Sequence, residues 1–437
     1  MSSNLSYKTV DDIALATMHF RGSLWHCLMV ASLLGILAGG YAWLVQLEHG
    51  LEWSGISHPV NWGTYISNFV FWIGIAHAGT LISAILYLTR STFRVSIHRI
   101  AEAITVFSIF IAALFPVIHL GRAWYAFWVV PYPHQRDLWP NFSSPLVWDA
   151  FAISVYFLVS LTFFLLGLIP DCAALRDRCK GWRYHLLRVL SFGFKGLDWQ
   201  WFYIGRGYLL IAALLTPLVI SVHSIVAWDF AVSSLPGWHS TLFAPYFVVG
   251  AIFSGSAMVL LVTIVLRFQY RGLQSLIRVE DLEAVAKLLL MMACLLLISY
   301  GIEFGIGFYS GSRAESSQFW YRALGDGAPV FWPMLLLNGV LPMLLWKRSI
   351  RNSEWWLFLI SLGVCIGMWI ERFLIITASL SHGLVPFTWD SYRFQWVEIW
   401  ITIGSFSLFL ALLLAFVRSL PSVAVSDLKR MIFRGKR

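Results

Sequence analysis

Charged side chains are scarce in this 437-residue sequence: Asp, Glu, Lys and Arg make up 12% of it, while hydrophobic residues make up 59%. About a quarter of the residues of a soluble globular domain are charged, so the composition excludes a soluble globule. The sequence also lacks the ten-residue segments of alternating polarity that are typical of an outer-membrane β-barrel. The composition therefore predicts a helical protein that crosses a membrane many times.

Cysteine is also rare, with five residues and no Cys-x-x-Cys motif. Iron–sulfur clusters are usually held by four cysteine thiolates. Nor does any apolar stretch carry two histidines about four turns apart, the spacing expected of a four-helix protein that binds two haems. We therefore expect no haem, no iron–sulfur cluster and no metal site within this chain.

Ten apolar stretches are long enough to cross a bilayer, which takes roughly 20 mostly apolar residues. They are 24–45, 62–88, 100–120, 147–169, 207–228, 243–266, 283–304, 329–346, 355–380 and 395–417. The first stretch lacks a convincing cleavage site, so we do not expect a cleavable signal peptide. The predicted fold class is all-α, a polytopic membrane protein of about ten transmembrane helices.

Most of the 31 Lys and Arg residues lie in every second connection between these stretches. The positive-inside rule then places those connections and both termini in the cytoplasm. Cytoplasmic loops that face anionic lipid account for the net charge of +9. The basic balance therefore calls for membrane lipid as a partner and does not call for nucleic acid.

Ionisable residues inside the predicted spans are functional candidates by default. Five of them come from five different spans, and the topology places them all in the outer half of the membrane: His119, Asp149, Asp229, Glu303 and Arg372. Each alone has a bland explanation, such as helix capping or an ordinary first-turn carboxylate. Together they predict one shared polar site, in which a histidine and carboxylates would accept the hydroxyl protons of a quinol.

A second set of polar residues lies within the spans and is predicted to contribute to a proton route. Its members are His77, Glu102, Glu303, Asn338 and Glu371. For His77, a neutral imidazole bonded to a neighbouring helix is an equally good interpretation. Because adjacent residues do not face each other on a helix, Glu371 and Arg372 are expected to have separate partners. A carboxylate from another span is expected to pair with Arg372.

Three runs of sequence resemble a known group of membrane subunits. They are HLGRAWYAFWVVPYP…SSPLVWDAF, VHSIVAWDFAVSSLPGWHSTLFAPYFVVGAIFSG and GMWIERFLIITASLSHG. They are similar to the C subunit of alternative complex III, within the wider NrfD/polysulfide-reductase membrane-anchor family, and the similarity covers essentially all ten spans. The resemblance implies the following division of the chain. A cytoplasmic segment at 1–23 precedes a peripheral helix at 24–45, four-helix bundles at 62–228 and 243–380, a peripheral helix at 395–417 and a basic cytoplasmic tail at 418–437.

The same resemblance implies a function. Such proteins carry no haem and bind a quinol, often menaquinol, near a [3Fe–4S] cluster of a periplasmic iron–sulfur B subunit. Electrons continue through clusters or c-type haem subunits, and a sister F subunit and small membrane subunits complete the assembly in the bacterial inner membrane. The resemblance makes four residues the quinol-site residues here: His119, Asp149, Asp229 and Arg372. The first three are expected to be catalytic, and this intact His–Asp set favours a C-type over an F-type subunit.

Two other functions are open from the sequence. A cofactor-free ion or solute transporter would fit paired halves and broken helices. A structural or proton-conducting subunit without a working quinone site would fit the same composition. The polar residues gather near the outer side rather than at the midplane, and the aromatic outer loop 121–146 is typical of a docking face. These two features favour quinol oxidation over transport.

Overall fold

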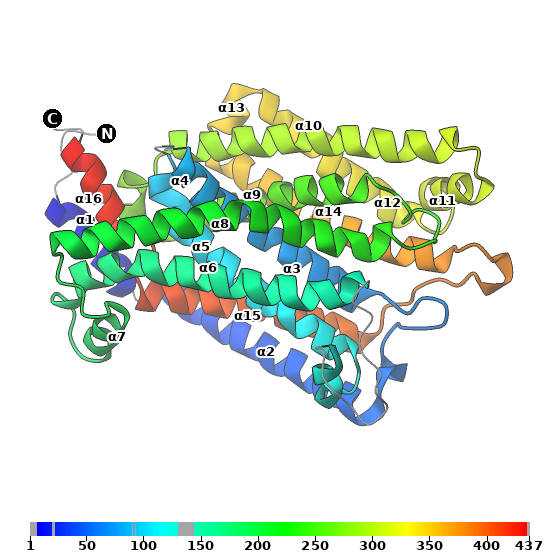
Figure 1. Cartoon of the computed structure of the whole chain (residues 1–437), viewed down its shortest axis with the longest axis horizontal. Helices are drawn as coiled ribbons and strands as arrows, with labels where there is room; N and C mark the ends of the chain where they lie inside the picture. Colours follow the sequence, from blue (N-terminus) through cyan, green and yellow to red (C-terminus); the bar gives the residue numbers. More distant parts are fainter. Residues whose placement is uncertain (1–6, 20–21, 90, 92, 130–143, 435–437) are drawn as a thin grey trace.

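The computed structural model describes residues 7–19, 22–89, 91, 93–129 and 144–434. These residues form helices and their connections, and no strand occurs among them. In this part of the chain, ten helices are long and apolar enough to cross a membrane. They run side by side along the long axis of the molecule (Figure 1). The predicted all-α polytopic fold is confirmed, and the chain is a multi-pass membrane protein.

Each predicted apolar stretch corresponds to one of these spans. In chain order they are α2 (Ser23–His49), α3 (Thr64–Thr80) continued by the π turn η2 (Leu81–Ile85) and α4 (Leu86–Leu88), α5 (Arg94–His119), α6 (Pro145–Arg176), α8 (Asp198–Ala231), α9 (Phe243–Gln269), α10 (Val279–Tyr309), α12 (Ala328–Leu335) continued by the π turn η5 (Leu336–Val340) and the 3-10 helix η6 (Leu341–Trp346), α14 (Glu354–Ser381) and α15 (Trp396–Ser419). The shorter elements outside the spans are α1 (Tyr7–His19), η1 (Leu51–Trp53), η3 (Ala123–Val129), α7 (Trp182–Leu190), η4 (Arg271–Ser275), α11 (Arg313–Leu324), α13 (Arg348–Arg351), η7 (Pro386–Thr388) and α16 (Val425–Arg434).

Both chain termini lie at one end of the molecule, here called the terminal end, together with α1, α7 and α16 (Figure 1). An ion pair of 2.7 Å between Asp11 and Lys429 joins α1 to α16. The other end, here called the opposite end, holds α11 and the connection from α8 to α9 (Figure 1). Of the predicted aromatic loop 121–146, residues 130–143 lie outside the described residues.

The spans pack in two neighbouring groups. Helices α3, α5, α6 and α8 contact one another and form the first helix group, while α9, α10, α12 and α14 form the second helix group. Helices α3 and α9 pack against each other where the groups meet, and they are the most buried spans. Helices α2 and α15 pack together on the first group and are among the least buried. The polar residues of α3 and α9 are therefore largely shielded by other spans.

Close packing of α2 on α15 depends on small residues, as the glycines of the first span predict. A Cβ on Gly39 would lie 2.8 Å from the Cα atom of Gly404 and 2.9 Å from the carbonyl oxygen of Trp400. Gly35 is in similar contact with Ser407. Small residues let two backbones approach this closely, which is the usual basis of helix association in a membrane.

Several helices extend farther than hydropathy predicts. Helix α5 begins at Arg94 rather than at 100, α6 ends at Arg176 rather than at 169, and α8 begins at Asp198 rather than at 207. All three extensions lie on the side of the terminal end, and those of α5 and α6 bury charged residues that pair with one another. Because a hydropathy window counts such residues as polar, it ends the predicted span too early.

The eighth span is irregular, as its two prolines predict. Helix α12 passes into a π turn at Leu336–Val340 and then into a 3-10 helix. Pro342 has no N–H group to donate to the carbonyl of Asn338, so the regular hydrogen-bond pattern is interrupted there. The other π turn, Leu81–Ile85, follows α3 directly. Turns of this kind are frequent at functional sites, and both here adjoin buried polar residues.

Candidate functional site

A pair of carboxyl groups lies at the opposite end of the first helix group. Asp149 lies in the second turn of α6, which begins at Pro145, and Asp229 lies in the last turn of α8. The two helices pack together, and the two carboxyl groups lie within hydrogen-bonding reach of each other. A hydrogen bond between two carboxyl groups requires a proton between them. This pair is therefore built to hold and exchange a proton.

The carboxyl pair also has free acceptor capacity. Asp149 is only 6% exposed, and its Oδ1 atom and that of Asp229 have no hydrogen-bond partner. Buried acceptors without a partner are costly, and they are a sign of a ligand or substrate site. Trp148 and Trp228, the residues that precede the two aspartates, lie with ring centroids 6.0 Å apart. The unpaired oxygen atoms thus lie beside aromatic residues.

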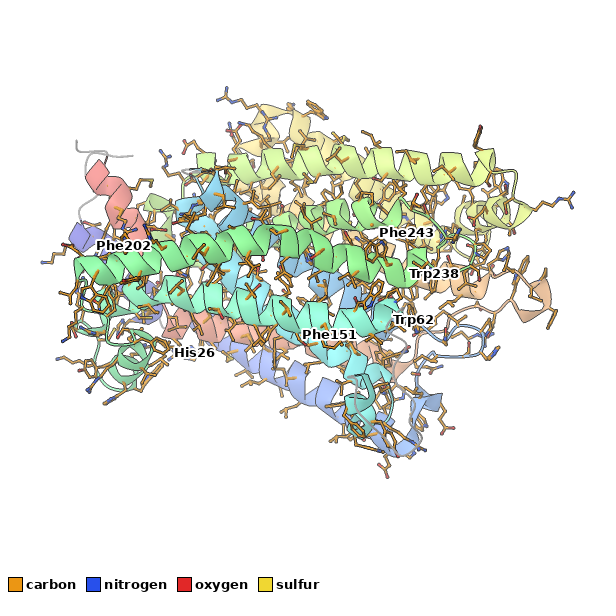
Figure 2. All side chains as sticks on the ribbon, viewed as in Figure 1. His26, Trp62, Phe151, Phe202, Trp238 and Phe243 are labelled. Atoms are coloured by element: carbon orange, nitrogen blue, oxygen red, sulfur yellow. The ribbon has the colours of Figure 1, made fainter. Side chains whose placement is uncertain are left out.

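Aromatic residues form a further cluster at this end. The ring centroids of Trp62 and Trp238 are 5.7 Å apart, and Phe230 lies 5.7 Å from Trp62 and 5.0 Å from Trp238. Trp62, Trp238 and Phe243 lie near one another at the opposite end (Figure 2). Phe230 is the residue after Asp229, so the cluster adjoins the carboxyl pair. An aromatic surrounding with a few polar groups is typical of a site for an apolar ring.

His119 is the last residue of α5 and is half-buried. Its Nδ1 atom has no hydrogen-bond partner. Helix α5 packs against α6, but no contact between described residues joins the His119 imidazole to Asp149 or Asp229. The structure therefore brings the two predicted aspartates together and leaves the third predicted catalytic residue at the neighbouring helix end.

A histidine pair lies deeper in the first helix group. His77 of α3 and His223 of α8 are fully buried, with ring centroids 4.5 Å apart. Nδ1–H of His77 donates to the carbonyl oxygen of Ile73 at 2.6 Å. Nε2 of His77 and both ring nitrogens of His223 have no partner. His77 was predicted from the sequence, but its partner was not.

The histidine pair continues the line of polar groups that starts at the carboxyl pair. His223 lies six residues before Asp229 on α8, or about 9 Å along the helix axis. On the other side, the ring of Tyr156 lies 5.2 Å from that of His77. The Tyr156 hydroxyl contacts the hydroxyl of Thr80 at 2.7 Å. Polar groups therefore follow one another from the opposite end into the middle of the first group.

A charged cluster lies toward the terminal end of the same group. Arg99 donates to Glu102 at 2.6 Å and to Asp171 at 2.8 Å. The Tyr208 hydroxyl donates to the other oxygen of Glu102 at 2.6 Å. The backbone N–H of Ser426, in the first turn of α16, donates to Asp171 at 2.8 Å. Glu102 was a predicted residue, and it is held by groups that were not identified from the sequence.

The second helix group contains a separate polar centre around Glu371. Its carboxylate accepts hydrogen bonds from the Tyr300 hydroxyl and, at 3.1 Å, from the Asn338 side chain. Asn338 also donates to the Tyr300 hydroxyl at 3.2 Å. Two of the predicted residues, Glu371 and Asn338, are therefore brought together. Tyr300 links them, although no sequence pattern singles it out.

The prediction that Arg372 pairs with a carboxylate from another span is wrong. Nη1 of Arg372 lies 3.2 Å from Glu371, the preceding residue. The arginine side chain is long enough to turn back toward its neighbour, so the divergence of adjacent residues on a helix does not separate their charges. The guanidinium lies 4.2 Å over the ring of Phe247. Neither Nη atom has a geometrically sound hydrogen bond.

Arg372 and Glu303 therefore differ in what they face. The ring of Phe247 lies 5.9 Å from His223, so Arg372 lies on the side of the second group that faces the histidine pair. Glu303 instead pairs with Arg322 of α11 at 2.8 Å, at the opposite end of the second group. The five predicted outer residues thus occupy several places: a carboxyl pair, a nearby histidine, an arginine between the groups and an ion pair elsewhere.

Comparison with known proteins agrees with this architecture. A protein family described as "Polysulphide reductase, NrfD" matches residues 53–382, which include both helix groups. A protein of Halobacterium salinarum, named as the putative C-type membrane subunit of a dimethyl sulfoxide reductase, is 26% identical over 426 residues, covering 89% of this chain and 90% of the relative. The C-type subunit of a selenate reductase from Mesobacillus selenatarsenatis is 24% identical over 348 residues, covering 78% of this chain and 79% of the relative.

Proposed function

Because the chain belongs to the polysulphide reductase NrfD family, we propose that it is the quinol-oxidising membrane subunit of an oxidoreductase complex. The observation that carries the proposal is the carboxyl pair of Asp149 and Asp229, with one unpaired oxygen atom on each residue. Two relatives that match most of the chain are named as C-type subunits of a dimethyl sulfoxide reductase and of a selenate reductase. Both names are consistent with a complex that delivers electrons to an acceptor.

Oxidation of a quinol to a quinone releases two hydroxyl protons and two electrons. In this proposal, His119 and Asp149 accept the protons and Asp229 passes them to the opposite end. The proposed role of Arg372 is to orient a quinone oxygen or a carboxylate, which its unpaired Nη atoms would permit. A positioned acid–base group contributes about 10²–10⁴-fold to a rate. Loss of one carboxyl group is therefore expected to be severe.

The two electrons leave for a partner at the opposite end. We propose a periplasmic iron–sulfur subunit whose [3Fe–4S] cluster lies nearest the quinol, with further clusters or c-type haems beyond it. This places the opposite end in the periplasm and both termini in the cytoplasm of a bacterial inner membrane. The finer assignment is to the C-type membrane protein of alternative complex III, with menaquinol as the donor and a sister F-type subunit alongside.

The proposed proton route uses the deeper polar residues. In the first helix group, the His77–His223 pair lies between the carboxyl pair and the Glu102 cluster. In the second helix group, Asn338 and Glu371 form a hydrogen-bonded centre, and Glu303 lies nearer the opposite end. Each helix group thus contributes its own set of polar residues, in keeping with the two four-helix bundles proposed for 62–228 and 243–380.

The proposal is tested on the complex that copurifies with the full chain. We expect iron–sulfur protein in the purified material and quinol-dependent reduction of an artificial acceptor. Asp149→Asn should abolish that turnover without loss of the partner. Asp177→Asn is the matched control, since Asp177 follows the other end of α6 and is exposed. A chain that purifies without iron, or an Asp149→Asn complex with unchanged turnover, contradicts the proposal.

A further inference from the structure

A cavity of about 330 Å³ lies in the second helix group, away from the carboxyl pair. Its walls come from the end of α10, the short helix α11 and the start of α9. We call it the α10–α11 cavity. Its polar lining includes Glu303, Arg322, Glu315 and Gln318, and its aromatic lining includes Phe243, Phe304 and Phe319. Pockets for small ligands usually measure about 300–1,000 Å³ and combine apolar walls with a few polar groups. This cavity has those properties.

Two buried side chains of the lining have one unpaired atom each. Gln318 is 2% exposed and Arg322 is 4% exposed. They are four residues apart on α11, so they lie on one face of that helix. Gln318 Nε2 donates to the carbonyl oxygens of Ala378 and His382, which leaves Oε1 without a partner. Arg322 Nη1 donates to Glu303, which leaves Nε without one.

The unpaired atoms define the group that would fit. Arg322 Nε is a donor and Gln318 Oε1 is an acceptor. A hydroxyl group satisfies both, because it accepts from the arginine and donates to the amide oxygen. An anionic head group is disfavoured, since the lining holds two carboxylates, Glu303 and Glu315, against one guanidinium. The polar end of the cavity therefore suits a neutral hydroxyl group.

The remaining walls suit an aromatic ring. The centroids of Phe304 and Phe319 lie 5.3 Å apart, and Phe243 is fully buried at the start of α9, where Figure 2 labels it near Trp238. Ile306 lines the cavity and is 51% exposed on an apolar span, so the cavity adjoins the lipid-facing side of α10. Gly307 also lines it, and a Cβ there would meet nothing within 4 Å.

We propose that the α10–α11 cavity is a second binding site, for the hydroxylated aromatic head group of a quinol, distinct from the site at Asp149 and Asp229. Arg322 and Gln318 bind the hydroxyl, and the phenylalanines contact the ring. The inference goes beyond the proposed function, on which it rests only in assuming that quinols are the ring compounds present in the same membrane.

The test is a titration of the purified complex with a fluorescent hydroxyquinoline N-oxide, whose emission changes on binding. The wild-type complex is expected to bind two equivalents per chain. Gly307→Phe fills the cavity and should bind one. Gly305→Phe is the matched control, because Gly305 lies on the same helix outside the cavity and also has open space around its Cβ position. It should bind two equivalents.

A second variant guards against misfolding of the first. Arg322→Lys keeps the positive charge beside Glu303 but removes Nε, and we expect at least a tenfold loss of affinity at one of the two sites. One equivalent in the wild type, or two equivalents in both Gly307→Phe and Arg322→Lys with unchanged affinity, overturns the inference. Asp149→Asn separates the two proposals. If it leaves both equivalents bound while Gly307→Phe removes one, the second site stands and the assignment of the first fails.

Discussion

The imidazole rings of His77 and His223 lie 4.5 Å apart where α3 meets α8, and three of their four nitrogen atoms have no hydrogen-bond partner. Both residues are fully buried. A protein selected for stability alone would place apolar side chains here, because an unsatisfied buried polar group costs about 1–3 kcal/mol. The pair is therefore explained better by proton transfer than by packing.

This explanation predicts opposite effects of one substitution on stability and on activity. His223→Phe keeps a ring of similar size and removes two unpaired nitrogen atoms. The free energy of unfolding should stay equal or rise by up to about 3 kcal/mol, while quinol-dependent turnover should fall. Thermal unfolding and steady-state turnover of the same preparation check both. A variant that loses stability and keeps full turnover would show that the histidine has only a structural role.

The ion pair of Glu371 and Arg372 predicts non-additive effects. Arg372→Gln leaves a buried carboxylate without its cation, and Glu371→Gln leaves a buried guanidinium without its anion. Breaking a buried pair by removing one partner costs about 3–5 kcal/mol. The double variant leaves neither charge, so it should be more stable than the Arg372→Gln single variant. Unfolding midpoints of the three variants decide, and simple addition of the two losses would argue against a coupled pair.

Two adjacent glycines on α2 provide a matched test of the α2–α15 contact. Gly39→Leu forces a side chain into the backbone of Gly404 and Trp400 and should cost about 1–3 kcal/mol or more. Gly40→Leu places the same side chain where a Cβ meets nothing within 4 Å, so stability should be kept. The measurement is the thermal unfolding midpoint of each variant. Equal midpoints would mean that α2 does not pack on α15 through this face.

His382 predicts a pH dependence of stability at the opposite end. It follows α14, stacks on Trp389 with centroids 3.5 Å apart and contacts the Ser317 hydroxyl at 2.6 Å. Burial lowers the pKa of His382 below its usual 6.5. The neutral form is therefore favoured in the folded state, and the resulting stability is present above the unfolded pKa and declines as the pH falls through the folded pKa.

The matched variant for this prediction is His382→Phe, which keeps the stacking and cannot be protonated. Unfolding midpoints measured from about pH 8 to about pH 5, a range that brackets the usual histidine pKa, should fall less in His382→Phe than in the wild type. Parallel curves for the two proteins would show that His382 does not contribute to the acid sensitivity.

The fold was largely predictable from the sequence because membrane spans need length and apolarity, and these are local properties. All ten spans were found in this way. The boundaries at the terminal end were missed, because Arg99, Glu102 and Asp171 neutralise one another inside the protein and so permit helix where hydropathy indicates loop. The spacing of Arg99 and Glu102, three residues apart on the predicted helix, was a signal that could have located this cluster.

The site was predictable only in part, for a different reason. Topology predicts the depth of a residue in the membrane, but not the direction in which its side chain points around the helix. Asp149 and Asp229 share both depth and direction, whereas Glu303 shares the depth and faces Arg322. His223, Tyr300 and Arg322 were missed because buried partners of a predicted residue carry no signal of their own in a single sequence.

The most direct measurement is a double-mutant cycle on Asp149 and Asp229, read as quinol-dependent turnover of the purified complex. If both carboxyl groups handle the same proton, Asp149→Asn and Asp229→Asn should each lower turnover by about 10²–10⁴-fold. The double variant should then be no slower than the slower single variant, because residues that act as a unit have non-additive effects. Turnover within about twofold of the wild type in either single variant, or losses that multiply in the double variant, would contradict the account.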